Sequence, residues 1–248
     1  MDKSDLSTMR VEPYASDSIV HAIKRGTRGM PIVRDERDKR RFARLLFYAN
    51  DTYRDEYWER NTKDMDMFYR PTEWPERWPL VKILSWSLMS NHFHLVLKDV
   101  CDRGISKFMQ KLCGSVSTHF NAKYSEKGSV FQGSYKGRTA NTRGDGYLKL
   151  LAVYVMVKNP FELYKGGLKN AIQNFDEAYK WASQYPYCNL GDYTGYTNTP
   201  ITEKDIFGEM FTTPLEFKEF AREILNYKLE QLVALEMDKS DLSKIHVL

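Results

Sequence analysis

This chain contains few cysteines, no long apolar run and no strong excess of charge of one sign. Its 248 residues contain three cysteines, Cys101, Cys113 and Cys188, and none of them forms a CxxC pair. This count argues against a zinc ribbon and against the disulfide framework of a small secreted protein. No stretch approaches the roughly 18 apolar residues of a transmembrane helix, and the opening residues MDKSDLSTMR lack the apolar core of a signal peptide. We therefore expect a soluble, cytoplasmic protein that is held together by a hydrophobic core.

Positive charge is modest overall but concentrated in two segments. The formal net charge is +4. Nine basic residues lie between Ser18 and Arg44, against three acidic ones, and the second segment, KGRTANTR, occupies 136–143. Clustered lysines and arginines can bind phosphate groups, although a solvated helix face is the more common reason for such a cluster. Charge alone therefore leaves a nucleic-acid partner open without requiring one.

Hydrophobic periodicity predicts alternating strands and helices over roughly the first 160 residues. Strand segments are rich in apolar, β-branched and aromatic residues and end at turn residues, whereas helical segments space apolar residues three and four positions apart. The predicted strands are 18–26, the two arms of a hairpin over 81–98 that turns at Ser90-Asn91, and 129–140. The predicted helices are 35–50, 102–124 and 146–158, the last ending at Asn159-Pro160. Residues 51–80 give no clean period and are predicted as a loop with a helical turn or two.

The resulting order, β-α-β-β-α-β-α, is that of the ferredoxin-like split βαβ arrangement. We therefore predict an α+β fold in which helices cover one face of an antiparallel sheet. After Pro160 the chain becomes helical and loop-rich, with helices predicted near 169–184, 203–211 and 213–236 and a connector near 185–200. The predicted domains are an N-terminal tail over 1–15, a main domain over 16–162 and a helical C-terminal extension over 163–248.

The segment MDKSDLS occurs twice, at 1–7 and again at 237–243. One short repeat does not indicate a solenoid, which needs several stacked units. We interpret it as an artefact or a small duplication rather than as a functional element.

The tripeptide His92-Phe93-His94 is the clearest candidate for chemistry. In a strand, side chains two positions apart lie on the same face, so both imidazoles are expected to project together while Phe93 points to the other side. Two imidazoles in this arrangement can bind one divalent cation if a third ligand is supplied from elsewhere. The alternative is that one histidine is a buried structural group and the other is solvated.

Four segments together resemble the single-tyrosine HUH transposases, in particular the REP-associated tyrosine transposases of the insertion-sequence-200-like superfamily. These segments are VHAIKRGTRGMPIV with the following DERDKRRF, MSNHFHLVL, VFQGSYKG and YLKLLAVYVMVKNP. They occur in the family's order and span about residues 16–165. The resemblance implies that the 16–162 domain is an HUH transposase-like catalytic domain.

The resemblance also implies the reaction and its principal residues. His92 and His94 would hold Mg²⁺ or Mn²⁺, and Tyr154 would attack a phosphodiester of single-stranded DNA. The products would be a 5′-phosphotyrosine link and a free 3′-hydroxyl, which allow the strand to be cleaved and rejoined in transposition or recombination. Tyr147, seven residues earlier on the same predicted helix face, is the alternative nucleophile.

The chain departs from the common family pattern after the tyrosine. Tyr154 precedes Asn159 by five residues rather than four, and Lys158 occupies the four-residue position. In an α-helix, position i+5 is rotated well away from position i. The third metal ligand is therefore open: Asn159 can reach in if the helix end frays, or a water or another side chain takes the place. Lys158 is an alternative contact for a DNA phosphate.

Basic and polar residues near these segments are candidates for binding the phosphate backbone, which gives affinity without reading sequence. The candidates are Arg25, Arg28, Arg37, Arg40, Arg41, Gln132, Lys136, Arg138 and Lys158. His21 and His119 have no partner at an informative spacing and are interpreted as structural.

The predicted function is that of a metal-dependent transposase that binds and cleaves single-stranded hairpin DNA as a monomer or homodimer. The main alternative is a non-catalytic relative that keeps the fold and binds hairpin DNA or RNA. A histidine-triad hydrolase is disfavoured because Val96 occupies the place of its third histidine. Replication initiators and plasmid relaxases share the chemistry but usually occur in longer, multidomain chains.

Overall fold

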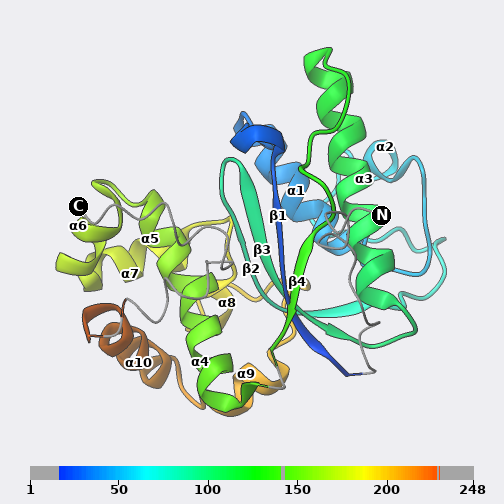
Figure 1. Cartoon of the computed structure of the whole chain (residues 1–248). Coiled ribbons are helices and arrows are strands. Elements are labelled where there is room, and N and C mark those ends of the chain that lie inside the picture. The colour runs from blue at the N-terminus through cyan, green and yellow to red at the C-terminus, as the bar shows by residue number, and fades with distance from the viewer. Residues whose placement is uncertain (1–16, 141–142, 228, 230–248) are drawn as a thin grey trace, which may run out of the picture. The chain divides into compact units, whose positions relative to one another are not determined.

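A computed structural model describes residues 17–140, 143–227 and 229 of the chain (Figure 1). By packing, the chain divides into two compact units. The first comprises Met1–Thr142 and Thr199–Glu203, and the second comprises Arg143–Asn198 and Lys204–Leu248. The packing boundary thus lies between Thr142 and Arg143, so the helix that carries Tyr154 packs with the second unit. The predicted catalytic domain over 16–162 is a functional division and stays a prediction.

The first unit is built on a four-stranded antiparallel sheet. Its strands are β1 (Ile19–Arg25), β2 (Val81–Leu88), β3 (His92–Asp99) and β4 (Lys136–Thr139). Their order across the sheet is β2-β3-β1-β4, and β3 runs antiparallel to both of its neighbours. The prediction of an α+β fold with the split βαβ order is therefore confirmed.

Two helices cover one face of this sheet (Figure 1). They are α1 (Glu36–Tyr48) and α3 (Gly104–Tyr124). A short helix, α2 (Trp58–Asn61), lies in the segment predicted as a loop with a helical turn or two. Asp35 begins α1 by accepting a hydrogen bond from the Asp38 N–H at 2.9 Å, as expected for an N-cap aspartate. The core forms where Phe93 of β3 packs on Phe42 of α1, with ring centroids 5.1 Å apart.

The β2–β3 hairpin turns at Ser90-Asn91, as predicted. The Met89 N–H donates to the His92 carbonyl at 2.9 Å, which closes a two-residue loop. This turn is held to the chain that follows β1, because the Gly26 N–H donates to the Asn91 carbonyl at 2.7 Å. The position where the second arm begins is therefore fixed from two directions.

The strand predicted over 129–140 is wrong in its first half. Only Lys136–Thr139 forms β4; of the preceding residues, Phe131 forms an isolated bridge with Gly26, and the Gln132 N–H donates to the Arg25 carbonyl at 2.9 Å. Gly133 has a positive φ of 51°, which turns the chain out of the strand conformation. Its carbonyl accepts a hydrogen bond from the Lys24 ammonium instead of pairing with β1.

The outer edge of β2 pairs at Ile83 with a segment from far along the chain. The Glu203 N–H donates to the Ile83 carbonyl at 3.0 Å, and Thr202 forms a parallel bridge with Ile83. The register between β2 and β3 shifts between Ile83 and Ser85, as at a β-bulge. The segment Thr199–Glu203 thus belongs to the first unit although the residues on either side belong to the second.

The second unit is helical, as predicted for the part of the chain after Pro160. Its helices are α4 (Asp145–Val153), a π-helical turn over Tyr154–Lys158, α5 (Asn159–Leu163), α6 (Gly167–Gln173), α7 (Phe175–Gln184), α8 (Leu190–Thr194), α9 (Asp205–Met210) and α10 (Pro214–Tyr227). The predicted helix over 169–184 is broken near Asn174, and the predicted connector contains α8. Residues 230–236 of the last predicted helix, and both copies of MDKSDLS, lie outside the described residues. Within the described ranges, no helix is long and apolar enough to cross a membrane.

The prediction that a helix ends at Asn159-Pro160 is wrong, because the helical path continues through these residues into α5. Proline inside an α-helix lacks the N–H for one hydrogen bond, and its ring clashes with the carbonyl four residues earlier. Here the preceding turn is π-helical, and the Asn159 N–H bonds to the Tyr154 carbonyl, five residues back. Pro160 lies in the first turn of α5, where a missing N–H is tolerated.

Candidate functional site

The sheet face turned away from α1 and α3 carries both histidines of the His92-Phe93-His94 motif together with several other polar residues. Directly paired residues of antiparallel strands share a face, and the pairs on this face are Arg25 with His92, Ile23 with His94, and Ser87 with His94. We call it the histidine face. Its polar members include His21 and Arg25 on β1, Lys82, Ser85 and Ser87 on β2, His92, His94 and Lys98 on β3, and Lys136 and Arg138 on β4.

His92 and His94 lie side by side on this face. Their ring centroids are 4.9 Å apart, whereas Phe93 between them packs into the opposite face against Phe42. The alternation expected from the sequence is therefore confirmed. His94 is fully buried, and His92 is half-buried at the end of the strand.

The neighbouring turn determines which nitrogen of His92 carries its proton. The Asn91 side-chain amide donates through Nδ2 to the Gly29 carbonyl at 3.1 Å, so its Oδ1 is the atom that faces His92. That oxygen lies 2.6 Å from His92 Nδ1 and can only accept a hydrogen bond. His92 therefore has its proton on Nδ1, and Nε2 carries the lone pair that a metal ion requires.

A third histidine, His21, lies against His94. The two rings meet edge to edge, with centroids 5.3 Å apart and planes at 22°, and His21 Nε2 lies 3.0 Å from His94 Nδ1. Burial lowers the pKa of His21 to about 3, with a smaller contribution from the positive charge of Arg138 on β4. His21 is therefore neutral near pH 7. The contact between His21 and His94 was not predicted, because it depends on the register between β1 and a strand more than seventy residues away.

The donor set fits a divalent cation that takes two nitrogen ligands. Imidazole nitrogens suit transition-series cations better than Mg²⁺, which prefers oxygen ligands, so Mn²⁺ is the better fit of the two predicted ions. Within the described ranges, no three His, Cys, Asp or Glu side chains are placed to hold one metal ion together. A third protein ligand from the described part of the chain would therefore be of another type, such as a side-chain amide.

Tyr154 lies in the second unit at the start of the π-helical turn and is fully buried. The expectation that Asn159 is rotated well away from Tyr154 is wrong, because it assumed α-helical geometry. In the π-helical turn the Asn159 N–H bonds to the Tyr154 carbonyl, the relation that residues i and i+4 have in an α-helix. One extra residue per turn thus places Asn159 one turn beyond Tyr154, near the same side of the helix.

Lys158 is held against Tyr154 by its own helix. Its side chain is 2% exposed and forms an ion pair of 2.7 Å with Glu162. The ammonium lies 5.0 Å from the centroid of the Tyr154 ring, within range of a cation–π interaction. Positive charge therefore lies next to the predicted nucleophile.

Tyr147, the alternative nucleophile, is half-buried on α4. The Arg143 guanidinium lies 5.1 Å from the centroid of its ring. Both tyrosines thus have a cation beside the ring, and these contacts do not choose between them.

Seven of the nine predicted phosphate-binding residues fall into two groups. Lys136, Arg138 and Arg25 lie on the histidine face, and Gln132 and Arg28 lie in the exposed segments beside it. Arg37 and Arg40 are exposed on α1, the helix that packs against the other face of the sheet. The structure therefore brings only part of the predicted set to the two histidines.

Arg41, another predicted phosphate ligand, forms several bonds within the protein. Its Nε donates to Glu59 at 2.8 Å, and its terminal nitrogens donate to the Ser115 carbonyl and hydroxyl at 3.2 and 3.0 Å. These contacts join α1 to α2 and α3. A phosphate contact for Arg41 stays a prediction.

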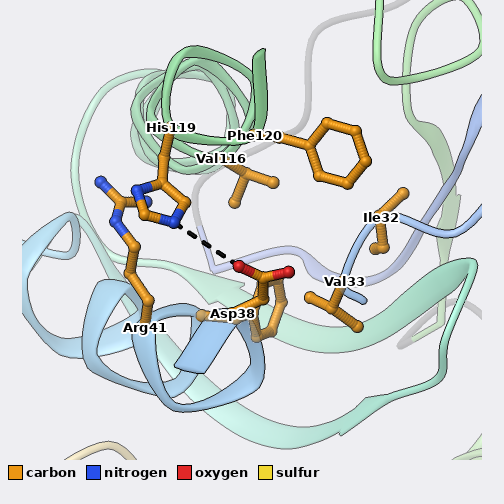
Figure 2. Close-up of a pocket in the computed structure, with 8 residues that line it drawn as sticks. Ile32, Val33, Asp38, Arg41, Val116, His119 and Phe120 are labelled. Atoms are coloured by element: carbon orange, nitrogen blue, oxygen red, sulfur yellow. Dashed lines mark ion pairs between the residues drawn. The ribbon is translucent and has the colours of Figure 1, made fainter. Parts of the chain in front are cut away.

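Arg41 also lines a small cavity between α1 and α3, with a volume of about 10 Å³ (Figure 2). There His119 Nε2 lies 3.6 Å from Asp38 Oδ1. Burial tends to raise the pKa of Asp38, but hydrogen bonds from Lys123, Tyr124 and the Arg34 N–H together lower it to about 2. This cluster lies on the helix-covered side of the sheet, and its contacts serve to join the two helices.

Comparison with known proteins gives one family. Residues 43–157 match the family described as "Transposase IS200 like", so the resemblance expected from the sequence is confirmed for these residues. No curated protein matches the chain significantly. A solved structure described as a REP-associated tyrosine transposase bound to a REP hairpin is similar at 12% identity and a TM-score of 0.42, covering 80% of this chain and 91% of that one.

Proposed function

Because residues 43–157 match the IS200-like transposases, we propose that this chain is a metal-dependent transposase that cleaves and rejoins single-stranded DNA beside a hairpin. The observation that carries the proposal is the pair His92 and His94, adjacent on a polar sheet face that also carries Arg25 and Arg138. A pair of imidazoles for a cation and cations for phosphates are the groups that phosphodiester cleavage needs.

His92 and His94 would hold the cation through Nε2, and Asn159 is the candidate third ligand through its side-chain oxygen. The π-helical turn supports Asn159, because it offsets the extra residue between Tyr154 and Asn159. The charge of the bound cation would stabilise negative charge on the oxygens of the scissile phosphate.

Tyr154 would supply the nucleophile. Its phenolic oxygen would bond to phosphorus as the proton leaves, and the bond from phosphorus to the 3′-oxygen would break, with that oxygen taking up a proton. The 5′-phosphotyrosine link conserves the phosphodiester bond, so another 3′-hydroxyl can reverse the step without ATP. A phenol is a weak nucleophile near neutral pH, and the Lys158 ammonium places positive charge beside the ring.

A second candidate function is hairpin binding without cleavage. It is favoured by the buried ion pair of Lys158 with Glu162. Lys158 occupies the position four residues after the tyrosine, and a charged lysine cannot ligate a cation. In this alternative, Arg138 and its neighbours hold the phosphates and no adduct forms.

The test is a covalent-adduct assay on a denaturing gel. Single-stranded oligonucleotides covering palindromes that flank the gene are incubated with the full chain and Mn²⁺ or Mg²⁺. We expect a metal-dependent shifted band that is lost in Tyr154→Phe and in the double variant His92→Ala/His94→Ala.

Tyr147→Phe is the matched control. A band that survives Tyr154→Phe but is lost in Tyr147→Phe would show that Tyr147 is the nucleophile, with the reaction class unchanged. Tight hairpin binding with no adduct in the presence of either metal would reject the transposase activity and support hairpin binding without cleavage.

A further inference from the structure

His21 is joined to a proposed metal ligand although it lies outside the predicted ligand set. The His21–His94 contact is a nitrogen–nitrogen hydrogen bond of 3.0 Å between two fully buried rings. One proton lies in such a bond, so one ring donates and the other accepts. The position of this proton determines whether His94 Nε2 carries a lone pair or a proton.

Metal binding through His94 Nε2 permits only one of the two arrangements. Nε2 must carry a lone pair, so the ring proton of His94 must lie on Nδ1, and Nδ1 must donate to His21 Nε2. His92 is held in the same form by another group, because its Nδ1 donates to Asn91. The two imidazoles would thus be set in one tautomer by two unrelated contacts.

Burial and the edge-to-edge contact with His21 also restrict rotation of the His94 ring. The planes of His21 and His94 are 22° apart, and both rings are fully buried. His21 projects from β1 next to Arg138, its direct partner on β4. His21 is not itself a ligand in this arrangement: Nε2 accepts the hydrogen bond, so the ring proton lies on Nδ1 and neither nitrogen offers a lone pair to the cation.

We infer that His21 is a positioning residue of the proposed metal site, which accepts the His94 Nδ1–H and so orients His94 Nε2 toward the cation. This inference rests on the metal-binding part of the proposed function. Partners of this kind typically contribute 10- to 100-fold to metal affinity.

The experiment compares two substitutions at position 21 in the full chain. His21→Gln places an acceptor near the position of Nε2, whereas His21→Leu removes the acceptor while filling most of the volume. The first readout is the tautomer of His94 in the metal-free protein, from nitrogen-15 NMR of the histidine rings. The second is the affinity for Mn²⁺ by calorimetry, with far-UV circular dichroism as the check on folding.

We expect His94 to have its proton on Nδ1 in the wild type and in His21→Gln. We expect His21→Leu to lose this preference and to bind Mn²⁺ 10- to 100-fold more weakly, with His21→Gln close to the wild type. If His21→Leu does not fold, the wild-type tautomer and the Gln variant still decide the question.

Two results would overturn the inference alone: a wild-type His94 protonated on Nε2, or a folded His21→Leu that binds Mn²⁺ as tightly as the wild type. A wild type that binds no Mn²⁺ would instead overturn the metal site of the proposed function, and the inference with it. The two failures are therefore distinguishable.

Discussion

At the scale of single residues, Asp38 is where the polar contacts between α1 and α3 converge. Its carboxylate accepts hydrogen bonds from Lys123 and Tyr124, each at 2.6 Å, and from the Arg34 N–H at 2.8 Å. These partners favour the charged form and keep the pKa at about 2, below the ordinary value of 3.8. The interaction therefore stabilises the fold fully above about pH 4, and this contribution is lost as the pH falls toward 2.

We expect Asp38→Asn to remove this part of the pH dependence. The free energy of unfolding of the wild type should fall by about 2 kcal/mol more than that of the variant between pH 5 and pH 2, since one pKa unit is about 1.4 kcal/mol. Urea titrations across this range measure the difference. Asp176→Asn is the control, because that carboxylate also has a pKa of about 2, set by Arg222 and Lys218, but is exposed and screened by solvent. Equal slopes for Asp38→Asn and the wild type would contradict the prediction.

At the scale of elements, the chain that leaves β1 supports the turn that carries Asn91. Gly26 has no room for a side chain, since a Cβ there would meet the Met30 carbonyl oxygen at 2.1 Å. Gly114, in the middle of α3, would meet nothing within 4 Å. The two glycines therefore respond in opposite ways to the same substitution.

We expect Gly26→Ala to lower the free energy of unfolding by about 1–3 kcal/mol, because the backbone must shift to relieve the clash. Gly114→Ala should raise it by about 0.5–1 kcal/mol, because alanine is the better helix former. Denaturant unfolding of both variants tests this. A Gly26→Ala protein as stable as the wild type would show that the β1 turn does not need glycine.

The π-helical turn is the second element with a testable consequence. If it makes the five-residue spacing equivalent to the usual four, deleting Met156 should leave a regular α-helix with Asn159 still one turn beyond Tyr154. We expect this deletion to keep the Mn²⁺ affinity within about threefold, and insertion of one alanine after Met156 to lower it at least tenfold. Circular dichroism confirms that both variants fold, and equal losses in both would argue against Asn159 as a ligand.

At the scale of the whole molecule, the position of the positive charges matters more than the net charge. The net charge is only +4, yet Arg25, Lys136 and Arg138 share the histidine face. Each phosphate contact to a single strand adds about 0.7 to the slope of log affinity against log salt. We expect a slope of about −2 for a single-stranded oligonucleotide, weakened by about 0.7 in Arg138→Gln. Arg41→Gln should leave the slope unchanged and lower only stability; a changed slope would show that Arg41 reaches phosphate despite its bonds to Glu59 and Ser115.

The sequence predicts what depends on local period and order. Alternation in β3 placed His92 and His94 on one face, and the turn at Ser90-Asn91 followed from residue type. His21 could not be paired with His94, because the pairing requires the register of strands that are distant in sequence. The hydrogen bonds of Arg41 within the protein could not be predicted either, because they involve Ser115, 74 residues away. The π-helical turn was missed because the apolar residues of 154–158 suit an α-helix equally well.

The short segment Thr199–Glu203 has a consequence for the order in which the protein is made. It completes the β2 edge of the first unit, yet it follows α4 through α8 in the chain. A ribosome releases residues in sequence order, so the first sheet keeps one bare edge until much of the second unit has been synthesised. Synthesis of the first unit therefore starts first, but its sheet is completed only after most of the second unit has been made. Until then, the edge of β2 is a surface on which nascent chains could form incorrect strand pairs.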